Sequence, residues 1–107
     1  MFQPIYEYAH VASSGRRYRP RAYGELQADG RWAGWLVFFL IGGGEVVATD
    51  RQTTQSTLAA LGEWAAGITP GYLEGALGRA LDLAHQPDFA MRLSELGRLE
   101  LLQDDRA

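Results

Sequence analysis

The chain has 107 residues, of which 47% are hydrophobic, and its formal net charge is −3. This length suits one domain with its own core, and the apolar share argues against intrinsic disorder. The absence of cysteine excludes disulfides, thiolate catalysis and zinc sites built from cysteine. No apolar run approaches the roughly 20 residues that span a bilayer, and the first residues lack the pattern of a signal peptide. We therefore expect a cytoplasmic protein without membrane contact.

The first predicted element is a short strand near the N-terminus. If Ile5–Val11 is extended, Tyr6 and Tyr8 point to the same side, because side chains alternate along a strand. The same pattern fits a free arm, so the sequence leaves open whether residues 1–12 form a strand or an arm.

Three strands are then predicted to form an antiparallel meander. Arg17–Ala28 alternates, and Pro20, which cannot donate a ladder hydrogen bond, places it at an edge or a strand end. Asp29-Gly30 predicts a two-residue type I′ turn, which needs positive φ at both positions. Trp32–Ile41 is apolar on both faces and is expected to be central. Glu45–Thr49 is the third strand.

Helices are predicted in the second half, where the hydrophobic period changes from about 2 to about 3.6. The apolar stripe from Leu58 to Ile68 predicts a first helix. Thr69-Pro70 starts a second helix, with Thr as N-cap and Pro at its first position. Phe89–Leu102 carries a weaker stripe and predicts a third helix.

Together these elements predict an α+β fold in a single domain over residues 1–107. We expect a three- to four-stranded antiparallel β-meander followed by two to three α-helices packed on one face of the sheet. Residues 1–53 are expected to be mainly β, residues 54–103 mainly α, and residues 104–107 a frayed tail.

The sequence offers little for catalysis. Its two histidines, His10 and His85, lie in different elements without an acidic partner at metal-ligand spacing. Motifs of serine hydrolases, zinc proteases and P-loop proteins are absent. Gly42-Gly43-Gly44 leads into a strand and is interpreted as a hairpin turn rather than a phosphate-binding loop. We therefore predict a non-enzymatic protein with no metal and no cofactor.

A row of arginines is the first candidate binding site. Alternation points Arg17, Arg19 and Arg21 to one side of a strand, with neighbours roughly 7 Å apart, and Tyr23 continues the row. Such a row can bind phosphates or an acidic partner surface, with the ring available for stacking. Alternatively, the arginines pair with acidic residues across the sheet and protect an exposed strand.

Four aromatic residues of the central strand form the second candidate site. By parity Trp32 and Phe38 share one face, and Trp35 and Phe39 share the other. One layer of helices covers only one face, so the other needs a partner, the third helix or the N-terminal arm. An uncovered aromatic face is an interaction surface, which predicts a homo-oligomer or another protein partner.

Three stretches follow an order known from one protein family. They are Tyr23-Gly24-Glu25 before the hairpin, Trp35-Leu36-Val37-Phe38 after it, and Thr49 followed by Thr54–Ala66. In this layout the chain resembles the HicB-like antitoxins, although Gly42-Gly43-Gly44-Glu45 replaces a segment in which the family has proline and glycine. The resemblance implies a partial RNase H-like arrangement and a dimer that neutralises an RNA-cleaving partner.

The charges help to rank the functions that remain. Residues 1–53 contain six arginines and five acidic residues, whereas residues 54–107 contain four arginines and eight acidic residues. An acidic second half disfavours binding of nucleic acid over the whole surface. The sequence therefore predicts a small regulatory domain that binds protein, as a homodimer. The alternative is a module that binds nucleic acid or another anionic ligand through the row of arginines.

Overall fold

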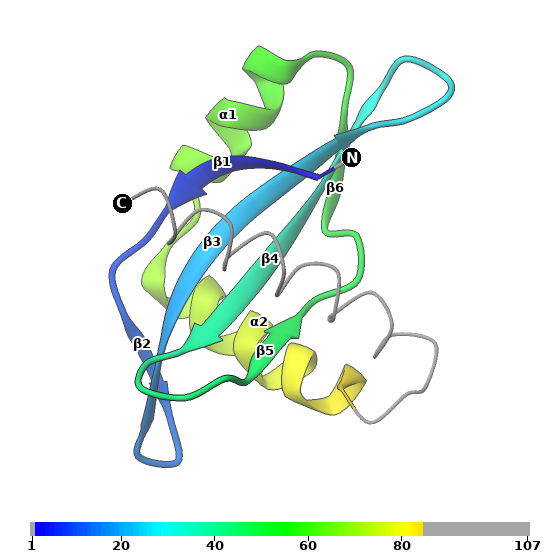
Figure 1. Ribbon diagram of the computed structural model, residues 1–107. Helices are drawn as coiled ribbons and strands as arrows, with labels where there is room; N and C mark the ends of the chain where they lie inside the picture. Colours follow the sequence, from blue (N-terminus) through cyan, green and yellow to red (C-terminus); the bar gives the residue numbers. More distant parts are fainter. Residues whose placement is uncertain (1, 85–107) are drawn as a thin grey trace.

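The computed structural model describes residues 2–84 as one antiparallel sheet with two helices (Figure 1). The strands are β1 (Gln3–Glu7), β2 (Val11–Ser13), β3 (Arg16–Leu26), β4 (Trp32–Leu40), β5 (Val46–Ala48) and β6 (Thr53–Gln55). The helices are α1 (Leu58–Ala66) and α2 (Pro70–Leu83). The predicted α+β class is confirmed. The third helix predicted over Phe89–Leu102 and the predicted tail lie outside the described residues.

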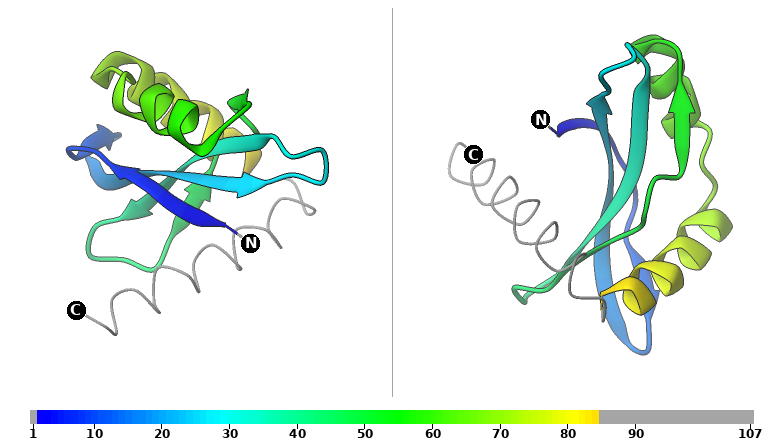
Figure 2. Two further views of the ribbon diagram at one scale, coloured as in Figure 1. Left: turned by 90° about the horizontal axis from the view of Figure 1, so that it is seen from above. Right: turned by 90° about the vertical axis from the view of Figure 1, so that its right-hand side faces the viewer.

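The long strands β3 and β4 form the centre of the sheet, so the predicted edge or strand-end position of Pro20 is wrong. They pair antiparallel in an unbroken register from Tyr18 opposite Leu40 to Leu26 opposite Trp32. Two short strands share each outer edge, with β1 and β2 paired to β3 and with β5 and β6 paired to β4. Seen from above, both helices lie on the same side of this sheet (Figure 2).

The sheet has six strands rather than the predicted three to four. The N-terminal residues form β1 and β2, so the alternative of a free arm is wrong for residues 3–13. Strand β6 was not predicted, because its three residues are polar and come just before a helix. Neither alternation nor apolar content marks such a strand.

The outer edge formed by β5 and β6 is interrupted. The N–H of Leu36 donates to Oγ1 of Thr49 at 3.1 Å, and the N–H of Thr49 donates to the carbonyl of Leu36 at 2.9 Å. The ladder resumes where the N–H of Gln52 donates to the carbonyl of Gly34 at 2.8 Å. Between these points Asp50-Arg51 is exposed. The buried hydroxyl of Thr49 thus replaces a backbone acceptor at the break.

The turn between β3 and β4 differs from the predicted type I′ turn. Gly30 has φ +86°, but Asp29 does not have the positive φ that this turn requires. The N–H of Gly30 donates to the carbonyl of Gln27 at 3.0 Å, and the N–H of Gln27 donates to the carbonyl of Arg31 at 2.8 Å. These bonds define a three-residue loop ending in a left-handed glycine, a common hairpin geometry. The carboxylate of Asp29 accepts the N–H of Arg31 at 3.0 Å, which fixes the loop.

Alternation along the central strands separates two apolar clusters. The cluster beneath the helices includes Tyr18, Ala22, Leu36, Phe38 and Val47 of the sheet and Ala65, Leu73, Ala76, Leu77 and Ala80 of the helices. The cluster on the opposite face consists of Phe2, Tyr23, Ala33, Trp35, Val37, Phe39 and Ala48. The predicted parity of Trp35 and Phe39 is therefore confirmed.

Both helices begin at threonine N-caps. The Oγ1 of Thr57 accepts the N–H of Ala60 at 3.0 Å, and the Oγ1 of Thr69 accepts the N–H of Tyr72 at 3.2 Å. The predicted start of the second helix at Thr69-Pro70 is confirmed. Within residues 2–84, neither helix has the length and apolar character needed to cross a membrane.

Two facing glycines let α1 lie directly on the sheet. Gly24 of β3 is opposite Gly34 of β4, and Leu61 of α1 packs over both. A Cβ on Gly34 would lie 2.8 Å from a methyl carbon of Leu61, and a Cβ on Gly24 would lie closer still. Real Cβ atoms essentially never make such contacts. A Cβ at either position would force the end of the Leu61 side chain to shift, so the pair of glycines, here called the glycine notch, makes room for Leu61 on the sheet.

We expect Gly24→Ala to lower the free energy of unfolding by about 1–3 kcal/mol, as overpacking a core does. The matched control is Gly62→Ala on α1, where a Cβ would meet no atom within 4 Å. It should instead raise the free energy of unfolding by about 0.5–1 kcal/mol, because alanine is the better helix former. Urea unfolding followed by tryptophan fluorescence measures both. Equal effects of the two substitutions would contradict the notch.

Candidate functional site

The structure divides the predicted row of arginines into a packed part and an exposed part. The guanidinium carbons of Arg19 and Arg21 lie 6.0 and 5.6 Å from the ring centroid of Phe39. Arg21 also pairs with Glu7 of β1 at 3.0 Å, and its side chain is only 11% exposed. Arg17 is exposed.

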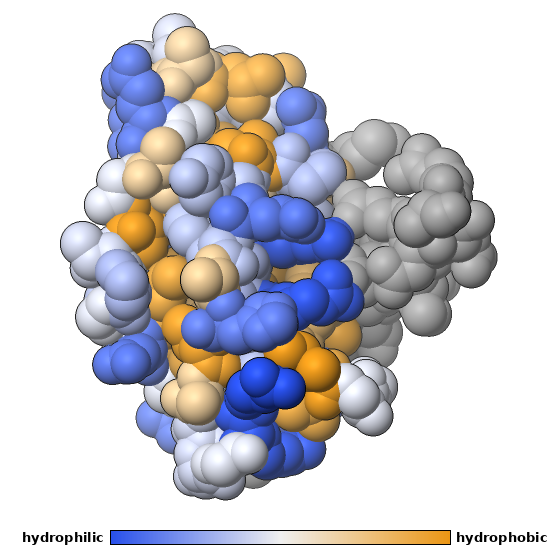
Figure 3. Space-filling model, turned by 90° about the vertical axis from the view of Figure 1, so that its left-hand side faces the viewer, coloured by the Kyte–Doolittle hydropathy of each residue, from blue (hydrophilic) through white to orange (hydrophobic). Residues whose placement is uncertain are grey.

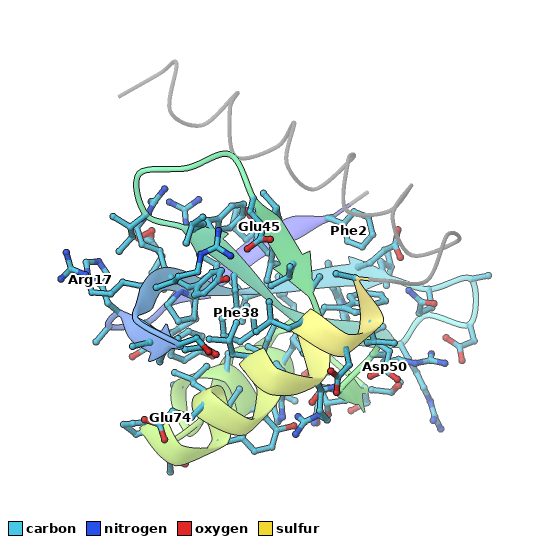
Figure 4. The ribbon with its side chains drawn as sticks, turned by 90° about the horizontal axis from the view of Figure 1, so that it is seen from below. Phe2, Arg17, Phe38, Glu45, Asp50 and Glu74 are labelled. Atoms are coloured by element: carbon cyan, nitrogen blue, oxygen red, sulfur yellow. The ribbon has the colours of Figure 1, made fainter. Side chains whose placement is uncertain are left out.

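The edge of the sheet formed by β1 and β2 is mixed in hydropathy (Figure 3). Viewed onto the edge that carries β1 and β2, hydrophilic side chains gather across the middle of the surface, with hydrophobic side chains on either side (Figure 3). Arg17 projects outward at one end of the sheet (Figure 4). The row is therefore not one uniform cationic surface, because two of its three arginines are packed.

The position of Tyr23 does not fit the stacking role predicted for its ring. Its side chain is fully buried, and its ring centroid lies 6.4 Å from that of Phe39. A ligand approaching from solvent therefore has no access to this ring for stacking. The alternative interpretation, in which arginines pair across the sheet, describes Arg21 well, although its partner Glu7 comes from the N-terminal strand.

The four aromatic residues predicted as an interface occupy different environments. Phe38 is fully buried and lies between the sheet and α2 (Figure 4). Trp35 and Phe39 are buried in the cluster on the other face, where Phe2 meets Trp35 edge to face with ring centroids 5.4 Å apart. Of the four, Trp32 is the most exposed, being half-buried at the start of β4.

Trp32 lines a groove at the end of the sheet where β3 and β4 are joined. The groove has a volume of about 420 Å³ and is lined by Phe2, Gln3, Pro4, Leu26 and Trp32. Leu26 ends β3 opposite Trp32, and at 56% exposed it is the most exposed large hydrophobic residue in the described part of the chain. These five residues are here called the hairpin-end groove.

Sequence reasoning found only one residue of the hairpin-end groove. It singled out Trp32 but not Phe2, Pro4 or Leu26. The available signal was a leucine directly before a hairpin turn, where polar residues are usual. The N-terminal contribution had no local signal, because it depends on how β1 pairs with β3.

Two tyrosines tie loops to the core through their hydroxyl groups. The hydroxyl of Tyr8 donates to the carbonyl of Ala65 at 2.7 Å, and that of Tyr18 donates to Oε1 of Glu45 at 2.8 Å. Burial raises the pKa of Tyr8. Burial also raises the pKa of Tyr18, and the bond to Glu45 adds to this effect. Both hydroxyls therefore stay protonated donors well into the alkaline range.

A polar cluster fastens α2 to the break between β5 and β6. The Oε1 of Gln52 accepts the hydroxyl of Tyr72 at 2.6 Å and the guanidinium of Arg79 at 2.8 Å. The amide of the same Gln52 donates to Asp50 at 3.0 Å. Each member thus has a structural partner.

The described residues contain no metal site of the usual kind. No group of three or more His, Cys, Asp and Glu side chains in residues 2–84 is placed to hold an ion. His10 is exposed, and His85 lies outside the described residues. Comparison with known protein families, with curated proteins and with solved structures finds no match. The surfaces described above are therefore the candidate functional sites.

The different environments of the arginines lead to a prediction about stability. Arg21→Gln should lower the free energy of unfolding by about 1–2 kcal/mol, because it removes an ion pair and a cation–π contact. Arg17→Gln, from the same row, should change it by no more than about 0.5 kcal/mol. Urea midpoints at low ionic strength measure the difference. If both variants lost the same stability, the division of the row would be wrong.

Proposed function

We propose that this chain is a non-enzymatic interaction domain that forms a two-fold dimer through the hairpin-end groove. The observation that carries the proposal is the position of Leu26, which is 56% exposed and lines an apolar groove. A projecting side chain beside a groove is self-complementary, because Leu26 of each copy can enter the groove of the other. Two-fold dimers use such contacts, in which both copies present the same patch.

The composition of the groove supports a protein partner. Trp32 supplies a large half-buried aromatic surface, and Phe2 and Pro4 supply rigid apolar contacts. Tryptophan is enriched among the residues that dominate binding energy, and such residues cluster in pockets. Leu26 has no comparable cover in the described residues, so association would remove its apolar surface from water.

The rim of the groove suits association with a second copy. Asp29 and Arg31, on the adjacent hairpin loop, are exposed and opposite in charge. Across a two-fold axis, each charge of one copy can meet its opposite on the other. A mixed rim of this kind gives no attraction to a strongly acidic or strongly basic partner.

Dimerisation by strand addition is poorly suited to this sheet. On β1, Pro4 has no N–H to donate, and the register shifts between Pro4 and Tyr6. On the other edge, β5 and β6 have three residues each, with Asp50-Arg51 between them. Prolines, bulges and short strands are the devices by which proteins protect sheet edges from pairing. The proposed contact therefore uses side chains at the end of the sheet.

The alternative function, anion binding along the whole row of arginines, has weaker support. Arg19 and Arg21 lie beside the ring of Phe39, and Tyr23 is buried. A dimer is also what the resemblance to HicB-like antitoxins implies. Neutralisation of an RNA-cleaving partner would be a second role for such a dimer, and no contact in residues 2–84 assigns a surface to it.

Sedimentation equilibrium tests the proposed dimer. The unaltered chain should be dimeric at high concentration, and Leu26→Glu should weaken the dimer by at least about 30-fold, as loss of a dominant interface residue does. Leu58→Glu is the matched control, because Leu58 is 39% exposed and lies on α1 outside the groove. It should leave the dimer intact.

Two results would contradict this proposal. One is a chain that stays monomeric at millimolar concentration. The other is a dimer that survives Leu26→Glu while both variants keep the circular dichroism spectrum of the unaltered chain.

A further inference from the structure

A second hollow lies at the opposite end of β3 from the hairpin-end groove. The turn between β2 and β3 and the loop between β4 and β5 border a hollow there of about 330 Å³ that is open to solvent. Its lining includes Gly15, Arg16, Arg17, Gly42 and Gly43. This site is here called the basic hollow. The two loops are tied together, because the N–H of Ile41 donates to the carbonyl of Arg17 at 2.9 Å.

The basic hollow has two guanidinium groups that are available to a ligand. Arg17 is exposed and has no acidic partner within residues 2–84. Arg16 lies 3.7 Å from Glu45, and the two side chains are 53% and 38% exposed. An exposed pair at this distance contributes at most about 1 kcal/mol. Arg16 can therefore exchange this contact for a stronger one.

Glu45 itself is already held by another group. Its Oε1 accepts the hydroxyl of Tyr18 at 2.8 Å, and Tyr18 is fully buried in the core beneath the helices. This bond keeps the carboxylate in place when Arg16 turns away. The balance of charge at the hollow is then two cations against one anion, which favours an anionic ligand.

The glycines leave the backbone open to close approach. Gly15 and Gly42 have φ of +77° and +82°, and a Cβ on either would meet no atom within 4 Å. Positions of this kind are typical of tight turns, and they also allow a ligand to reach backbone N–H groups without a side chain in the way. The hollow thus combines two forked cations with unobstructed backbone.

We infer that the basic hollow binds the phosphate group of a small phosphate monoester. Such a group carries about −1.5 to −2 charges at pH 7 and three acceptor oxygens, which match the two guanidinium groups of Arg16 and Arg17. A carboxylate offers one charge and two oxygens and would leave one arginine unused. A nucleic acid strand would need the cations to continue along β3, where Arg19 and Arg21 lie beside Phe39.

Titration of the ¹⁵N-labelled chain with inorganic phosphate tests this inference. The backbone amide signals of Gly15, Gly42 and Gly43 should shift and saturate at millimolar phosphate, and added chloride should weaken binding. Arg17→Gln should weaken binding about tenfold, the loss expected for one charge-assisted contact. Arg51→Gln, which removes an exposed arginine between β5 and β6 and outside the basic hollow, should leave binding unchanged.

Several outcomes would overturn the inference. One is the absence of a saturable shift at the three glycines. Another is an unchanged response in the double variant Arg16→Gln/Arg17→Gln, provided that its spectrum keeps the dispersion of a folded protein. Acetate that binds as tightly as phosphate would overturn the assigned ligand class. A single-stranded oligonucleotide that binds where inorganic phosphate does not would overturn it as well.

Discussion

The contact between Leu61 and the glycine notch is the constraint on which the rest of the structure depends. Because Gly24 and Gly34 have no side chains, α1 approaches the backbone of both central strands. Elements distant in sequence meet at the same point: Ile5 of β1 lies against Gly24, and Thr53 of β6 lies against Gly34. The notch therefore brings together both outer edges of the sheet and the first helix.

The position of the notch also determines what remains exposed. Side chains alternate between the two faces of the sheet, so every second residue pair lies on the same face. On the face of the notch, the pair that follows Gly24 and Gly34 toward the hairpin is Leu26 and Trp32. Helix α1 packs at the notch, and Leu26 at the end of β3 is left largely open to solvent. The apolar groove proposed as a dimer contact is thus exposed because α1 packs at the notch and does not cover Leu26.

The two ends of β3 present different chemistry. Its last residue, Leu26, belongs to the apolar hairpin-end groove, and its first residues, Arg16 and Arg17, belong to the basic hollow. Between them Arg19 and Arg21 pack beside Phe39. One long strand therefore separates a surface suited to protein from a hollow suited to an anion, with packed residues between them.

Local sequence patterns predicted the strands and helices that have strong local signals. They failed to predict features that depend on which residues pair across the sheet. Alternation identified β3, a run of apolar residues on both faces identified β4, and Thr69-Pro70 marked the start of α2, because each signal is contained in a few neighbouring residues. The type I′ turn was predicted at the wrong hairpin: positive φ at two successive residues occurs at Ser14-Gly15, between β2 and β3, and not at Asp29-Gly30.

The notch and the groove could not be predicted, since both depend on which residues face each other across strands. Nothing local indicates that Gly24 lies opposite Gly34 or that the N-terminal strand contributes Phe2 to a groove with Leu26. Of the predicted row of arginines, Arg19 and Arg21 lie on the same side of the strand, beside Phe39. The division of the row into packed and exposed parts depends on Phe39 and Glu7, which come from the two neighbouring strands.

A double-mutant cycle between Gly24→Ala and Leu61→Ala tests the central constraint most directly. The free energy of unfolding of the unaltered chain, both single variants and the double variant is measured in urea. If Leu61 rests in the notch, shortening it makes room for the new methyl group, and the double variant should be more stable than additivity predicts by at least about 1 kcal/mol. Additive effects within about 0.5 kcal/mol would show that the two residues do not interact and would contradict the account.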